Sequence, residues 1–86
     1  MSYSLFLEKQ VIKFLSKLDI KTKKRIFQKI EELQKVPIPH ESKRIVNAKE
    51  PTFRIRVGTY RILYRIENNR LIIVFLIDKR SKVYKK

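Results

Sequence analysis

The stretch TFRIRVGTYRILY, residues 52–64, decides the fold expected of this 86-residue chain. Apolar side chains at positions 53, 55 and 57 alternate with arginines at 54 and 56, and a second alternating run begins at Tyr60. A period of two is typical of a strand with one buried face. Gly58, the only glycine, lies between the two runs. The stretch therefore predicts two antiparallel strands joined by a tight turn.

The flanking residues extend this sheet. The sequence ENNR at 67–70 predicts a hairpin turn, because asparagine tolerates positive φ. Residues 71–77 are almost wholly apolar, as in a strand that is buried on both faces. Residues 3–7 predict a short first strand, and residues 37–51 predict a loop with a short strand near 43–46.

Apolar side chains at helical spacing fill the segment between the first strand and this loop. One helix is expected from Glu8 and a second after Asp19, whose side chain suits an N-cap, and Pro37 and Pro39 end the second helix. The expected apolar stripes are Val11, Ile12, Leu15 and Leu18 with Phe14 at the edge, and Ile26, Phe27, Ile30 and Leu33.

A link this short between the helices predicts a helical hairpin. The element order is thus β-α-α-β-β-β. It predicts an α+β fold in which an N-terminal helical hairpin packs on one face of a mainly antiparallel sheet. A chain of this length has room for one core, so residues 1–86 are expected to form a single domain.

Positive charge dominates the composition. The chain has 22 lysines and arginines against 8 aspartates and glutamates, a formal net charge of +14. Such a field attracts polyanions, of which nucleic acid is the commonest in a cell, although an anionic membrane or an acidic protein meets the same electrostatics. Six of the eight arginines follow residue 50. Because the guanidinium fork suits phosphate, the second half of the chain is the expected site.

Other features limit the compartment and the partners. The chain has no cysteine, so disulfides and thiolate zinc play no part. No apolar run approaches the ~20 residues that cross a bilayer, and the first residues lack a secretory layout, so the cytoplasm is the expected compartment. The helical stripes are narrow and have a core to cover, so no membrane partner is expected.

Strand geometry gathers the arginines on one surface. If the apolar side chains of the two central strands face the helices, Arg54 and Arg56 face away from them. The same alternation turns Arg61 and Arg65 outward and the tyrosines at 60 and 64 inward, as core residues. The sequence thus predicts a basic floor on the open face of the sheet.

Residues 52–64 resemble the central signature of RelE/ParE toxins, in which an aromatic residue, alternating basic residues, a glycine turn and a Tyr-Arg-x-x-Tyr strand follow one another. The segment KRSKVY at 79–84 is similar to the basic end of the RelE branch, which closes on Val-Tyr. The helical hairpin fits as well. The resemblance implies a toxin of a type II toxin–antitoxin system that cuts mRNA in the ribosomal A site. It also implies a RelB-like antitoxin, acidic and partly disordered when free.

The same resemblance implies roles for individual residues. Arg54 and Arg56 would contact the substrate backbone, and Arg65 joins them as a substrate-binding candidate. Arg61 and Arg80 would stabilise charge on the scissile phosphate. Tyr84 would activate the attacking 2′-hydroxyl.

General chemistry agrees with these roles. RNA supplies its own nucleophile, so cleavage requires in-line geometry, a proton acceptor and positive charge, with no metal or other cofactor. Guanidinium groups around a tyrosine favour its ionised form. Members of the family commonly have lysine where this chain has Arg54 and Arg56. Since arginine effectively cannot release a proton, the leaving-group proton must come from elsewhere, or the enzyme is slower.

Other interpretations stay open. The strand arginines are alternatively a solvated face, and Tyr84 a hydrophobic plug. His40, the sole histidine, is expected to be an exposed surface residue, because no orienting partner is recognisable near it. Two rival functions remain: a ParE-like toxin that inhibits DNA gyrase, and an RNA- or ribosome-binding module without catalysis.

Overall fold

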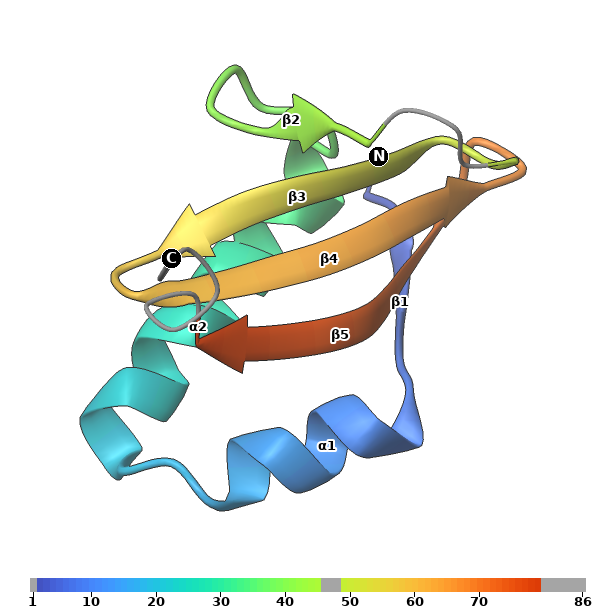
Figure 1. Cartoon of the computed structure of the whole chain (residues 1–86). Helices are drawn as coiled ribbons and strands as arrows, with labels where there is room; N and C mark the ends of the chain where they lie inside the picture. Colours follow the sequence, from blue (N-terminus) through green and yellow to red (C-terminus); the bar gives the residue numbers. More distant parts are fainter. Residues whose placement is uncertain (1, 46–48, 80–86) are drawn as a thin grey trace, which may run out of the picture.

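The computed structural model describes residues 2–45 and 49–79. Its strands form one five-stranded sheet with the order β1-β5-β4-β3-β2, and both helices lie on one side of this sheet (Figure 1). Strand β1 pairs in parallel with β5, and all other neighbours are antiparallel. The expected α+β fold is confirmed. The elements are β1 Ser4–Leu7, α1 Lys9–Ser16, α2 Ile20–Lys35, β2 Lys43–Arg44, β3 Thr52–Val57, β4 Tyr60–Glu67 and β5 Leu71–Lys79.

Two tight turns set the register of the three long strands. Gly58 has a φ of +61° between β3 and β4, a conformation that glycine adopts without strain. Asn68 and Asn69 have φ values of 55° and 53° between β4 and β5, as the two central residues of a primed hairpin turn require. The predicted turns are therefore confirmed.

The second helix has the expected boundaries. The Asp19 carboxylate accepts a hydrogen bond from the Thr22 backbone N–H at 3.1 Å and another from its hydroxyl at 2.7 Å. These bonds lower the pKa of Asp19, because they stabilise its ionised form. The helix ends at Lys35, two residues before Pro37.

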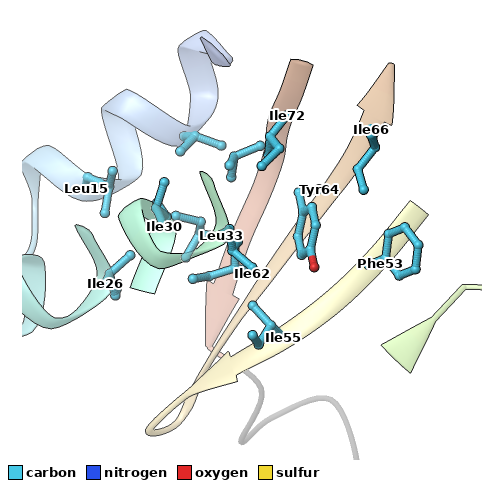
Figure 2. Packing of buried hydrophobic residues seen from close by; sticks show 13 residues of the cluster. Leu15, Ile26, Ile30, Leu33, Phe53, Ile55, Ile62, Tyr64, Ile66 and Ile72 are labelled. Carbon is cyan, nitrogen blue, oxygen red and sulfur yellow. The ribbon is translucent and has the colours of Figure 1, made fainter. Parts of the chain in front are cut away.

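The core lies between the two helices and the sheet face that they cover (Figure 2). Two stripe residues are exposed, Ile12 to 54 % and Phe27 to 37 %, whereas Leu18 and Phe14 are partly buried against the core. The two exposed residues each directly follow a fully buried residue, Val11 or Ile26, and one helical step turns a side chain by about 100°. The cluster of buried residues is Val11, Leu15, Ile26, Ile30, Leu33, Phe53, Ile55, Ile62, Tyr64, Ile66, Ile72, Val74 and Ile77.

The last strand is less buried than its composition predicts. Ile72, Val74 and Ile77 join the core, and Ile73 is buried opposite Arg65 of β4. In contrast, Leu71, Phe75 and Leu76 are only partly buried. The prediction of burial on both faces was wrong there, because the helices cover one face of the sheet and leave the other largely open (Figure 1).

Tyr64 ties the segment after α2 to the sheet. Its side chain is fully buried, its ring stacks on Phe53 with centroids 5.7 Å apart, and its hydroxyl donates a hydrogen bond of 2.7 Å to the Pro37 carbonyl. Burial raises the pKa of Tyr64 to about 12. Tyr60 packs edge-on against Phe14. Tyr64 is thus a core residue, as the alternation predicts, whereas Tyr60 faces the same side but is only partly buried against the core.

Candidate nucleic-acid interface

Five basic side chains of β2, β3 and β4 share the open face of the sheet, and Arg65, opposite Thr52, is one of them. Lys43 of β2 lies opposite Arg54 of β3, and Arg56 of β3 lies opposite Arg61 of β4. Cross-strand partners point to the same side, as do residues two apart in one strand. The predicted grouping of Arg54, Arg56 and Arg61 on one face is therefore confirmed, and Lys43 joins them.

Three of these cations line one hollow. Lys43, Arg54 and Arg56 surround it together with Glu41. None of the three cations forms an ion pair with a carboxylate that the structure describes. Glu41 is 3.0 Å from the ammonium of Lys29, and that hydrogen bond lowers the pKa of Glu41. The hollow therefore presents uncompensated positive charge, which suits a phosphate.

Arg61 is held in a different way. Its Nε and Nη2 donate to the two oxygens of Asp78 at 3.0 and 2.8 Å, across β4 and β5. The Arg61 side chain is 15 % exposed and that of Asp78 33 % exposed. A bidentate pair of this kind fixes the orientation of a guanidinium and offsets its charge. Asp78 was not among the residues predicted from the sequence.

Arg65 is surrounded by acidic groups. Its guanidinium lies 3.6 Å from Glu8, 3.3 Å from Glu50 and 3.2 Å from Glu67, and it sits over the ring of Phe75. These contacts join β4 to three other segments. They also offset its charge, so Arg65 offers a phosphate less attraction than Arg54 or Arg56 does. Its role in substrate binding stays a prediction.

Two of the predicted catalytic residues, Arg80 and Tyr84, lie outside the described residues. His40 is exposed, as expected. Tyr64 is buried and its pKa is raised to about 12, so it is protonated at neutral pH and does not serve as a proton acceptor. Within residues 2–45 and 49–79, no group of three histidines, cysteines or acidic residues is placed to hold a metal ion. No helix in the described part of the chain has the length and apolar character to cross a membrane.

Comparisons with known proteins agree with the fold of this chain. Residues 5–84 match the family described as ParE toxin of type II toxin–antitoxin system, parDE. A chain of the archaeal RelE–RelB complex from Pyrococcus horikoshii is similar in fold, with a TM-score of 0.84 and 24 % identity over 95 % of this chain and 99 % of that one. A chain of the RelB–RelE complex from Methanococcus jannaschii has a TM-score of 0.72 and 27 % identity, over 93 % and 95 %.

The isolated RelE toxin of Escherichia coli has the same fold, with a TM-score of 0.78 and 23 % identity over 96 % of this chain and 92 % of that one. The comparison with curated proteins gives no match. Because the family match spans nearly all of the sequence, the chain belongs to the RelE/ParE superfamily of type II toxins, and its fold is that of the RelE-like members.

Proposed function

We propose that this toxin is a ribosome-dependent endoribonuclease that cleaves mRNA in the A site and thereby inhibits translation. The observation that carries the proposal is the hollow between β2 and β3. There Lys43, Arg54 and Arg56 present charge that no described carboxylate pairs with, and Arg56 lies opposite Arg61 across β3 and β4. A phosphodiester backbone is the ligand that such a row of cations fits.

In this proposal Arg54 and Arg56 bind the RNA backbone and place the scissile phosphate toward Arg61. The 2′-oxygen forms a bond to phosphorus and the bond from phosphorus to the 5′-oxygen breaks. The products are a 2′,3′-cyclic phosphate and a 5′-hydroxyl. The phenolate of Tyr84 accepts the 2′-proton, and Arg61 and Arg80 stabilise the charge on the phosphoryl oxygens.

The 5′-oxygen also needs a proton as it leaves. Arginine cannot supply one, and Glu41 is ionised because Lys29 lowers its pKa. Of the four side chains that line the hollow, the ammonium of Lys43 is the group able to donate. We therefore assign leaving-group protonation to Lys43, on the strand next to the arginines.

Asp78 gives Arg61 a counter-ion within the protein. A phosphate that reaches Arg61 meets a guanidinium already oriented by a carboxylate. The same carboxylate competes with the phosphate for that charge. Asp78 thus positions Arg61 at a cost in RNA affinity.

A RelB-like antitoxin is the proposed partner, because the similar archaeal chains come from RelE–RelB complexes. An acidic antitoxin would block the RNA site by covering this basic face. Since the ribosome is the proposed target, the proposed place of action is the cytoplasm.

The test is primer extension on a message incubated with the purified toxin, with and without programmed ribosomes. The proposal predicts cuts only with ribosomes, within the A-site codon. It also predicts that a message with a 2′-deoxy nucleotide at the cut position stays intact there. Cleavage at the deoxy position would rule out the 2′-hydroxyl as nucleophile.

The family match itself favours a second candidate, because its description is that of a ParE toxin. In this alternative the protein inhibits DNA gyrase by binding it and cleaves nothing. Loss of gyrase supercoiling activity at toxin concentrations that leave every message intact would select this candidate over the nuclease.

A further inference from the structure

A second hollow adjoins the proposed RNA site. It is lined by Arg56, Val57 and Gly58 at the end of β3 and by four residues of α2, which are Arg25, Gln28, Lys29 and Glu32. Arg56 also lines the hollow beside Lys43 and Arg54. The two hollows therefore meet at Arg56, and together they run from β2 across β3 to α2.

The sheet leaves this path open. Strand β2 pairs only with Phe53 and Arg54 of β3, so no described strand covers the outer edge of β3 from Ile55 to Val57. A ligand bound at Arg54 and Arg56 can thus continue past this edge toward α2, which lies on the covered side of the sheet (Figure 1).

Arg25 of α2 lies close to the turn at Gly58. A β-carbon built on Gly58 would lie 3.4 Å from Nη2 and 3.8 Å from Nη1 of Arg25. The guanidinium therefore lies beside the turn, at a distance that a β-carbon would meet as ordinary van der Waals contact. The result is that Arg25 and Arg56 line the same hollow, although they are 31 residues apart in the sequence.

The two acidic residues along the path share one lysine as their ion-pair partner. Glu32 lines the second hollow and Glu41 the first, and the ammonium of Lys29 is 3.2 Å from Glu32 and 3.0 Å from Glu41. These contacts raise the pKa of Lys29, with the Glu41 hydrogen bond as the larger cause. In the described structure neither carboxylate pairs with Arg25 or Arg56. Two guanidinium groups around one hollow repel each other, and an anion bound between them removes that repulsion.

We propose that Arg25 binds a phosphate of the same RNA strand that Arg54 and Arg56 hold, so that the strand turns around the edge of β3 onto α2. We name Arg25, Arg56, Arg54 and Lys43 the basic track. A repeating polyanion fits the track better than a single anion does, because its cations come from three successive elements. This inference rests on the proposed RNA-binding function and adds a subsite to it.

The experiment measures the affinity of a short fluorescein-labelled single-stranded RNA as a function of salt. Each phosphate contact on a single strand contributes about 0.7 to the slope of log K against log salt. We expect Arg25→Gln to lower the slope by about that amount. The matched control is Lys24→Gln, which removes the same charge from the neighbouring exposed residue of α2 and should leave the slope nearly unchanged. Arg25→Lys keeps the charge and should keep most of the slope.

Arg56→Gln separates a failure of the subsite at Arg25 from a failure of the RNA site on the sheet. If it lowers the slope while Arg25→Gln behaves like Lys24→Gln, the subsite on α2 is refuted and the RNA site remains. If neither Arg56→Gln nor Arg25→Gln differs from Lys24→Gln, the proposed RNA face itself fails. A second arm uses vacant ribosomes. An effect of Arg25→Gln on ribosome binding, with none on free RNA, would assign the phosphate to ribosomal RNA and overturn the single-strand path.

Discussion

Tyr64→Phe tests whether the hydrogen bond from Tyr64 to Pro37 holds the segment between α2 and β2, which leads to Glu41 and Lys43 of the hollow. The substitution keeps the ring that stacks on Phe53 and removes the hydroxyl that donates to the Pro37 carbonyl at 2.7 Å. The carbonyl then loses its donor in a partly buried place. A loss of this kind lowers the free energy of unfolding by about 1–3 kcal/mol. Because the bond fastens the segment between α2 and β2, the position of Lys43 should loosen as well.

The effect should depend on pH in a defined direction. Burial raises the pKa of Tyr64 to about 12, whereas an unfolded tyrosine titrates near ~10. The folded state therefore binds the proton more tightly, so its contribution is fully present below about pH 10 and is lost as pH rises toward 12. At pH 11 the wild type should have lost about 1.4 kcal/mol through this residue. The Phe variant has no such loss, so the difference between the two proteins should shrink.

Urea denaturation at neutral pH and at pH 11 measures both quantities. Tyr60→Phe is the matched control, because Tyr60 is half-buried on the same strand and its hydroxyl has no hydrogen bond within the described residues. We expect its unfolding free energy to stay near that of the wild type at both pH values. If Tyr64→Phe is as stable as Tyr60→Phe, the bond to Pro37 contributes nothing to the free energy of unfolding. It then does not hold the segment between α2 and β2 in place.

Three further substitutions follow from the site and its turn. Asp78→Asn should lower the unfolding free energy by about 1 kcal/mol. It should also tighten RNA binding more than Glu31→Gln does, which removes the same charge from an exposed position of α2. Equal RNA affinities of the two variants would exclude competition between Asp78 and RNA for Arg61. Lys43→Arg keeps the charge and cannot donate a proton, so cleavage should slow while the RNA affinity stays unchanged. The rate should recover on a substrate with a 5′-thio leaving group, which needs no proton. If the thio substrate is cleaved just as slowly, Lys43 does not protonate the leaving group. Gly58→Ala should lower the unfolding free energy by about 1–2 kcal/mol, because φ is positive there; a melting temperature equal to that of the wild type would contradict this.

Local signals predicted most of the architecture. The cap at Asp19, the turn at Asn68 and Asn69, and the alternation in β3 and β4 depend on residues close together in the sequence. Such patterns report the preferences of the backbone and the direction of each side chain. The face that carries Arg54, Arg56 and Arg61 followed from these patterns alone.

The contacts of these arginines could not be predicted in the same way. The pairing of Arg61 with Asp78 depends on the register between β4 and β5, and this register shifts at a bulge next to Leu63. Two of the three carboxylates around Arg65, those of Glu8 and Glu50, come from segments distant from it in the sequence. Lys43 joined the site because a two-residue strand pairs with β3. In each case the partner is selected by long-range packing, for which the sequence carries no periodic signal.

The most direct test of the account removes charge from the open face of the sheet. Arg54→Gln/Arg56→Gln is compared with Arg70→Gln, which changes an exposed arginine in the β4–β5 turn, in single-turnover cleavage of A-site mRNA on programmed ribosomes. We predict that the double variant, folded as judged by its thermal melting, loses cleavage, whereas Arg70→Gln cleaves at nearly the wild-type rate. Equal cleavage by all three proteins would contradict the claim that this face binds and cuts RNA.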